Sequence, residues 1–324
     1  MRVHLKRAVL ALAVALLLSA GPRAATAATS SREVALTFDD LPHLREPLPI
    51  WQHTIARISE ALKARGITAV GFVNEEGLFR RNEVDARIDT LRAWLDAGLE
   101  LGNHNFGHAG VGSPLSLYQE HVIRGETVTR MVLAEKGCTL RYYRHTQLRT
   151  GPSDAYRTEL SAFLEQRGYT VAPVTIDTQD YVFAEVYAEA LRSGDDALRK
   201  RVADAYLRYS DQNLAFFDDL AVEALGRPVK HISILHANSL NAALMDQLLD
   251  QMERRGFRFI TVEEALCDPA YARPESTHKT GVSWLHRWMI QDGRRLREEP
   301  REPDWVQAHA KEIRTRRRKA ASSE

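Results

Sequence analysis

The sequence predicts an α/β fold in which parallel strands alternate with crossover helices, as a barrel or as a doubly wound sheet. Two observations support this expectation. Short apolar runs alternate with amphipathic helical stretches over most of the chain. Several of the helical stretches also end at a glycine just before a β-rich run, which is the usual way for a helix to end. These glycines are Gly66, Gly98, Gly168 and Gly256.

The individual elements follow from this alternation. The run VALTF at 34–38 is apolar without interruption, as expected for a buried strand of a parallel sheet. Further strands are expected at 68–73, 99–104, 140–145, 169–177 and 229–238, with a strand-to-helix step at 257–266. The expected helices lie at 54–66, 84–98, 158–168 and 241–256.

One interval departs from the alternation. Between Tyr181 and His236 lie 54 residues that contain no convincing strand before Val229. Segments of this interval have helical periodicity, so we expect a helical insertion over 182–230, before the last strands. It either serves the fold alone or helps to shape a substrate cleft.

The first 27 residues have the features of a cleaved signal peptide. A basic start at 2–7 is followed by an apolar run at 8–18 and by Ala25-Thr26-Ala27, which fits the small-x-small cleavage rule. We therefore expect a signal peptide over 1–27, a catalytic barrel over 28–275 and a C-terminal helical and basic extension over 276–324. The expected location is periplasmic or secreted, without stable membrane insertion after cleavage. A retained anchor is the alternative.

Charge and cysteine content narrow the range of partners. Removal of residues 1–27 takes four basic residues and no acid, so the formal charge falls from +1 to −3. That balance offers no general attraction to nucleic acid. The basic cluster at 311–319 is expected to be solvated, or else to contact anionic envelope polymers. Cys138 and Cys267 could pair in an oxidising compartment, but they form no CxxC motif.

Polar residues stand where the expected strands end. In a parallel barrel these ends share one face, which is where active sites lie. Acids, imidazoles and a guanidinium therefore converge there, supplied by Asp39, Asp40, His104, His108, Arg144, His145, Asp177, Asp180 and His236.

These side chains suit hydrolysis assisted by a divalent metal. Asp40, His104 and His108 would supply the carboxylate and two imidazoles of a catalytic zinc site. Asp39 is adjacent to Asp40 at the end of a strand, where successive side chains diverge, so the two acids would not easily reach the same metal. Asp39 is therefore better placed as a general base, and Arg144 could keep it ionised. His236 could protonate the leaving group. Each feature also has a purely structural alternative: a solvated turn for the two histidines, a helix cap for the two acids and a buried ion pair for Arg144.

Five motifs in this order resemble the polysaccharide deacetylases of carbohydrate esterase family 4, over about Val34 to Leu266. The motifs are TFDD (37–40), NHNFGH (103–108), YYRHTQ (142–147), DTQDY (177–181) and ILHAN (234–238). The resemblance implies a distorted parallel (β/α) barrel and a zinc-type metal, with Co²⁺, Ni²⁺ or Mn²⁺ as alternatives. It implies a polysaccharide deacetylase of carbohydrate metabolism that removes N-acetyl groups from amino sugars or O-acetyl groups from xylan.

Roles carried over by position match those above. In addition, the resemblance implies that Arg144 orients the base with the support of Asp180 or Asp177. It also implies that Leu235 helps to wall the acetyl pocket and that the backbone N–H of Gln147 is the oxyanion donor. The sequence departs from the family pattern at Asn105, where Ser or Thr is usual, and in the third motif, which lacks prolines and an aromatic residue. Tyr181 stands where Trp is frequent.

Two other functions remain open at this point. The same fold could hydrolyse a different amide or C–N bond on a small molecule, and a closed mouth built by the 182–230 insertion would favour that function. The chain could also be a carbohydrate-binding relative without catalysis. Retention of the acids and histidines named above argues against such a loss.

Overall fold

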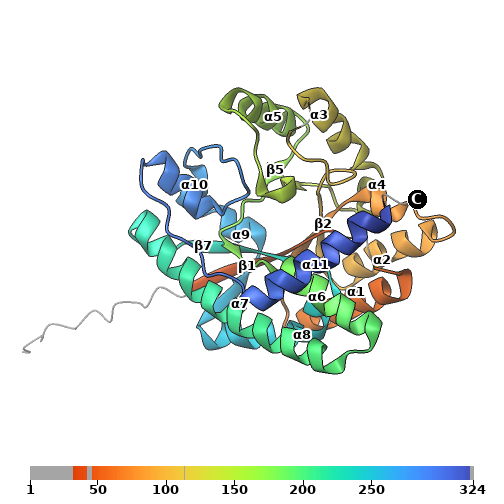
Figure 1. The fold of residues 1–324 in the computed structure, drawn as a ribbon. Coiled ribbons are helices and arrows are strands. Elements are labelled where there is room, and N and C mark those ends of the chain that lie inside the picture. Colours follow the sequence, from red (N-terminus) through yellow and green to blue (C-terminus); the bar gives the residue numbers. More distant parts are fainter. Residues whose placement is uncertain (1–31, 42–45, 113, 322–324) are drawn as a thin grey trace, which may run out of the picture. The chain divides into compact units, whose positions relative to one another are not determined.

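The computed structural model describes residues 32–41, 46–112 and 114–321. A parallel sheet curls into a half-barrel surrounded by helices, which confirms the predicted distorted barrel (Figure 1). Seven strands follow one another in the order β5-β4-β3-β2-β1-β7-β6, and β8 pairs with β1. Their bounds are β1 Arg32–Asp39, β2 Ala69–Val73, β3 Glu100–Asn103, β4 Tyr142–Tyr143, β5 Thr170–Val171, β6 Ile176–Asp177, β7 Lys230–His236 and β8 Phe257–Ile260.

Strand β1 is the centre of the sheet. It pairs with β7 along nearly its whole length, with β8 through its first residues and with β2 through Leu36–Phe38. The register sets Asp39 directly opposite His236. The apolar residues of β1 are fully buried, as the uninterrupted apolar run predicted. The two strands therefore deliver an acid and an imidazole side by side at one end of the barrel.

The β-rich run at 169–177 is two strands rather than one. Pro173 lies between β5 and β6 and cannot donate a ladder hydrogen bond. β5 pairs with β4 at one end of the sheet, and β6 pairs with β7 at the other. The chain at 172–175 therefore crosses the gap between the two ends of the curled sheet.

The helices cover the outside of the sheet. The expected helices appear as α1, α2, α5 and α8, and all four glycines that were predicted to end them have positive φ. The bounds are α1 Leu48–Ala64, α2 Val84–Asp96, α3 Leu115–Arg124, α4 Thr127–Glu135, α5 Asp154–Gln166, α6 Asp180–Ser193, α7 Asp196–Leu225, α8 Ser239–Arg254, α9 Val262–Leu266, α10 Trp284–Gln291 and α11 Asp304–Ala321. Single 3₁₀ turns lie at Glu75–Leu78, Thr146–Leu148 and Pro269–Ala272.

The interval 182–230 contains most of α6 and all of α7, a helix of 30 residues. Helix α11 lies beside α6 and contributes Val306, Ala310 and Ile313 to the buried core (Figure 1). Its basic residues were expected to be solvated; they are exposed or half-buried, and some of them also pair with acids of α6. Arg314 forms an ion pair with Glu185 of α6, and Arg316 forms one with Glu189. The sequence shows the basic residues of α11 but does not show that the acidic residues of α6 face them.

Three further expectations concern the surface and the ends of the chain. Cys138 and Cys267 are both exposed free thiols.

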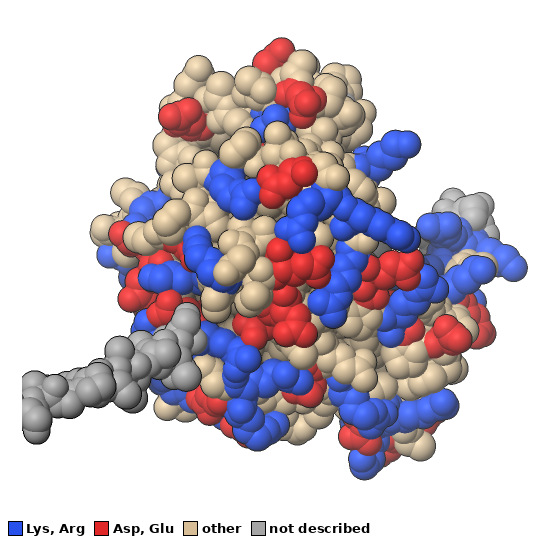
Figure 2. Space-filling view, turned by 90° about the vertical axis from the view of Figure 1, so that its left-hand side faces the viewer, with Lys and Arg blue, Asp and Glu red and all other residues tan. Residues whose placement is uncertain are grey.

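The face of the molecule in Figure 2 carries Lys and Arg interspersed with Asp and Glu. Within the described ranges no helix combines the length and the apolar character that a membrane crossing needs. The expected signal peptide at 1–27 lies outside the described residues.

Candidate active site

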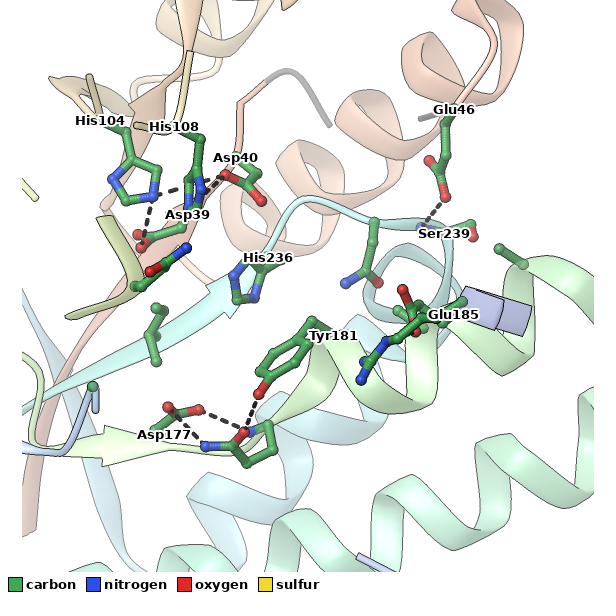
Figure 3. Close-up of a pocket in the computed structure, with 18 of the residues that line it drawn as sticks. Asp39, Asp40, Glu46, His104, His108, Asp177, Tyr181, Glu185, His236 and Ser239 are labelled. Atoms are coloured by element: carbon green, nitrogen blue, oxygen red, sulfur yellow. Dashed lines mark hydrogen bonds and ion pairs between the residues drawn. The ribbon is translucent and has the colours of Figure 1, made fainter. Parts of the chain in front are cut away.

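Most of the polar residues at the strand ends line one cavity of about 950 Å³: Asp39, Asp40, His104, His108, Asp177 and His236. Arg144, His145 and Asp180 are buried and are not among its lining residues. In Figure 3, His104, His108 and Asp40 gather on one side, with Asp39 beside them. His236 stands across from this group, and Tyr181 and Asp177 lie beyond it. The convergence predicted from the strand ends is therefore observed, and Gln147 also lines the cavity.

Asp40, His104 and His108 form a candidate metal-binding triad. Each offers one ligand atom, and these atoms all lie within 4.8 Å of one another. The Nε2 atoms of His104 and His108 lie 3.7 and 3.9 Å from Oδ1 of Asp40. One carboxylate oxygen and two imidazole nitrogens are a donor set that fits a divalent ion such as zinc and leaves a position for water.

The tautomer of His104 suits this role. Its Nδ1 lies 3.0 Å from the carbonyl oxygen of Arg144, so Nδ1 carries the proton and Nε2 keeps its lone pair for a metal. Burial lowers the pKa of His104, since it is nearly inaccessible to solvent. The imidazole is therefore neutral, as a metal ligand must be.

The turns that carry these ligands have unusual backbone conformations. Asp40, Asn105 and His108 have φ angles of 58°, 71° and 52°, and none of them is a glycine. Such strain in non-glycine residues is often found at functional sites. It also corrects the expectation that adjacent acids must diverge. Asp40 has left the strand and turned left-handed, so both acids face His104, whose Nε2 is 3.4 Å from Oδ2 of Asp39.

Asp39 and Arg144 form a buried pair next to the triad. Nη1 of Arg144 lies 3.8 Å from Oδ1 of Asp39, which is an ion pair without a direct hydrogen bond. Arg144 donates from Nη2 to Oγ1 of Thr37 at 2.8 Å and stacks over the Phe72 ring. Burial lowers the pKa of Arg144, while the charges of Asp39 and Asp177 oppose that change. Arg144 is thus a buried cation whose guanidinium lies beside the Asp39 carboxylate.

His236 is fixed by Asp180, which lies at the start of α6. Nδ1 of His236 donates to Oδ1 of Asp180 at 2.7 Å, and the backbone N–H of His236 donates to Oδ2 at 2.8 Å. Asn238 and Asn241 donate to Oδ2 as well. Burial opposes protonation of His236, but the Asp180 carboxylate outweighs it and raises the pKa of the imidazole to about 10. His236 is therefore an imidazolium at neutral pH and can act as an acid.

The family pattern left one role open and misplaced one residue. Asp180 or Asp177 was expected to support Arg144; the charge of Asp177 acts on Arg144, whereas Asp180 contacts His236. Burial raises the pKa of Asp177 to about 7. Leu235 was expected to wall the pocket, but Ile234 lines the cavity. Successive side chains of a strand point to opposite faces, so Ile234 shares the face of His236 and Leu235 packs behind it.

The remaining predicted residues lie at the mouth. Gln147 has a φ of 55° in the turn after β4. Tyr181 is 44% exposed, and its ring centroid lies 5.9 Å from that of His236. Thr37, Asn238 and Asn241 hold functional side chains but were not predicted to do so. For Asn238 and Asn241, the Asn-x-x-Asn spacing after His236 was the only sequence feature that could have indicated this role.

Comparison with known proteins bears on the family and on the fold. The sequence model of the polysaccharide deacetylase family matches residues 26–170, which include the first three motifs. This match confirms the predicted resemblance to polysaccharide deacetylases. No curated protein sequence matches the chain.

Among the similar solved structures, two share this fold with TM-scores of 0.50 and 0.51. A chitin deacetylase from the fungus Colletotrichum lindemuthianum is similar at 21% identity, with a TM-score of 0.51 over 74% of this chain and 89% of that one. A mutant of BA3943, a CE4-family pseudoenzyme from Bacillus anthracis, is similar at 16% identity, with a TM-score of 0.50 over 73% and 68%. The peptidoglycan deacetylase PdaC from Bacillus subtilis gives 19% identity and a TM-score of 0.46 over 73% and 90%.

Proposed function

We propose that this protein is a metal-dependent hydrolase that removes acetyl groups from a glycan or a glycan fragment. One observation carries the proposal: the triad Asp40, His104 and His108 shares a cavity with Asp39 and His236, which stand opposite each other in the β1–β7 register. A ligand set, a base and an acid are the three parts that metal-assisted amide hydrolysis requires.

The residues divide the chemistry between them. A divalent ion held by the triad would polarise the acetyl carbonyl and make a water more acidic. Asp39, which lies beside the guanidinium of Arg144, takes a proton from the attacking water. The backbone N–H of Gln147 donates to the oxygen that becomes negative. His236 gives its proton to the departing nitrogen or oxygen, which leaves acetate and the free sugar group.

We infer that the native ion is Zn²⁺. Two imidazoles and one carboxylate are characteristic of catalytic zinc sites, whereas ions such as Mn²⁺ favour more oxygen ligands. Co²⁺ and Ni²⁺ accept the same donors. Metal analysis of protein purified without added metal tests the inference.

The cavity favours a glycan fragment over the interior of a long polymer. Helix α6 supplies Ala184, Ala188 and Leu191 to its wall, and α11 supplies Arg314 and Arg317. A volume of about 950 Å³ is typical of a small-molecule pocket. The same feature supports a second candidate, hydrolysis of another amide on a small molecule. The similarity to a pseudoenzyme supports a third candidate, a carbohydrate-binding relative without catalysis, although the acids and histidines are all present.

Acetate release tests the proposal. We expect the zinc-loaded protein to release acetate from at least one member of a panel of chitin oligomers, peptidoglycan fragments and acetylated xylan, with short substrates preferred. The Asp39→Asn protein, which keeps the triad, is the matched control and should be at least 100-fold slower, as for loss of a general base (roughly 10²–10⁴). Metal-loaded protein that released no acetate from any of them would contradict the proposal.

We further propose that the protein is exported. The basic start, the apolar run and the Ala-Thr-Ala sequence within residues 1–27 support export. Fractionation of expressing cells, with the N-terminal residue of the exported form determined, tests it. Retention of the full-length chain in the cytoplasm would contradict it.

A further inference from the structure

Away from the metal triad, the wall of the cavity is rich in positive charge. Basic side chains reach it from the turn after β4, from α6, from the segment before α10 and from α11. They are Arg149, Arg192, Lys279, Arg314 and Arg317. The acids on this part of the wall are Glu46, Asp177 and Glu185. Cations thus outnumber acids where the rest of a substrate would lie.

All three acids are already engaged, and Asp177 accepts hydrogen bonds from Gln179. Glu46 accepts the backbone N–H of Ser239 at 3.2 Å, at the first turn of α8 (Figure 3). Glu185 forms ion pairs with Arg314 at 2.6 Å and with Arg317 at 3.6 Å. On the α6 side, therefore, the positive charge is partly balanced by protein carboxylates.

Arg149 and Lys279 differ from the other three cations. Within the part of the chain that the structure describes, neither forms an ion pair with a carboxylate, and Nε of Arg149 is buried without a hydrogen-bond partner. The two residues share one section of the wall. Gly281 lies so close to the turn before Arg149 that a Cβ on it would fall 2.0 Å from the carbonyl oxygen of Gln147. The chain around Lys279 therefore packs directly on the turn that carries Arg149.

We propose that Arg149 and Lys279 bind an anionic group on the substrate, a carboxylate or a phosphate. This inference rests on the proposed function, because it concerns the part of an acetylated sugar that lies outside the metal triad. Two cations without protein counter-charges in a partly enclosed cavity favour an anion strongly, and a guanidinium suits the oxygens of either group. The substrate class is then an acetylated sugar or short oligosaccharide that bears a negative charge.

Three disaccharides that share the same acetamido groups test this proposal. Diacetylchitobiose is neutral, its 6-phosphate carries a phosphate, and the N-acetylglucosamine–N-acetylmuramic acid disaccharide carries a carboxylate. We expect at least one charged compound to exceed the neutral one in kcat/KM for acetate release. In Arg149→Gln and in Lys279→Gln that preference should fall roughly tenfold or more, as for the loss of a charge-assisted hydrogen bond. The compound whose advantage disappears identifies the anion.

A double variant at exposed cations outside the cavity, Arg208→Gln/Lys63→Gln, has the same change in net charge as Arg149→Gln/Lys279→Gln and should keep the preference. Equal turnover of all three compounds by the native protein would overturn the anion site and leave the proposed function standing. A preference for a charged compound that survives in both cavity variants would also overturn the anion site and leave the proposed function standing.

If none of the three disaccharides releases acetate, the wider panel decides the proposed function, and binding decides the anion site separately. Calorimetry on the Asp39→Asn protein would then compare the three disaccharides with and without the two cavity substitutions. Tighter binding of a charged compound that depends on Arg149 and Lys279 supports the site. Equal binding of charged and neutral compounds refutes it.

Discussion

Replacing Asp180 by asparagine removes the negative charge behind His236 and keeps a side chain of nearly the same shape. In the native protein burial opposes protonation of His236, and the Asp180 carboxylate outweighs it, so that the pKa rises from 6.5 to about 10. That rise corresponds to roughly 5 kcal/mol of preference for the imidazolium. Without the carboxylate, burial becomes the dominant influence. We expect the pKa of His236 to fall to its ordinary value or below, which leaves a neutral imidazole at pH 7.

The assay compares two leaving groups over a range of pH. An amine must be protonated to leave, whereas an activated aryl oxide leaves without help. Asp180→Asn should therefore lower kcat/KM for an N-acetyl sugar by about 10²–10⁴ at pH 7, and that for an aryl acetate much less. His236→Ala should show the same contrast, and NMR titration of zinc-loaded protein should report the pKa directly. Equal losses on both substrates, or an unchanged pKa of His236 in Asp180→Asn, would refute the assignment of His236 as acid.

The same pair links stability to pH. The folded-state pKa of His236 is raised, so its contribution to stability is complete below pH 6.5 and is lost as the pH rises toward 10. The pKa of Asp180 is lowered from 3.8, so its contribution is present above that value and is lost as the pH falls through the folded-state pKa. The difference in free energy of unfolding between native and Asp180→Asn proteins should be largest between about pH 4 and pH 6.5 and smallest near pH 10, as urea denaturation would measure.

Three further predictions concern individual residues. Asp40→Asn should weaken zinc binding, whereas Asp39→Asn should keep the metal and slow turnover about 10²–10⁴-fold; the opposite pattern in metal analysis would reverse the two roles. His108→Ala should lower metal affinity with little effect on the thermal midpoint of the metal-free protein, and full metal retention would remove it from the triad. Leu235→Ala should lower the free energy of unfolding by about 2–5 kcal/mol, because it truncates a core side chain. Ile234→Ala, in contrast, should raise KM. If Leu235→Ala changed only KM, Leu235 would belong to the cavity wall.

The ends of the strands could be predicted from the sequence because periodicity marks where a buried run stops. Asp39, Asp40, His104, His108 and His236 all follow such a stop, and a parallel sheet brings its strand ends to one edge. Their convergence could therefore be predicted without knowing the conformations of the loops. The fold class followed from the same alternation.

The errors arose where one-dimensional patterns are ambiguous. A strand buried on both faces has no polar alternation, so the sequence does not show which of Ile234 and Leu235 faces the site. The role of Asp180 depends on how the first turn of α6 meets the end of β7, which is a tertiary contact. The ion pairs of α11 likewise depend on where that helix packs, and amphipathic periodicity does not identify the partner helix.

Titration of metal into metal-free protein, with acetate release measured at each step, tests the central claim most directly. If Asp40, His104 and His108 hold the ion that hydrolysis requires, activity on an acetylated oligosaccharide rises from near zero and stops rising at about one Zn²⁺ per chain. Protein that carries Asp40→Asn should need far more metal to reach any activity. Acetate release that is unchanged in metal-free protein, or that does not depend on Asp40, would contradict the account.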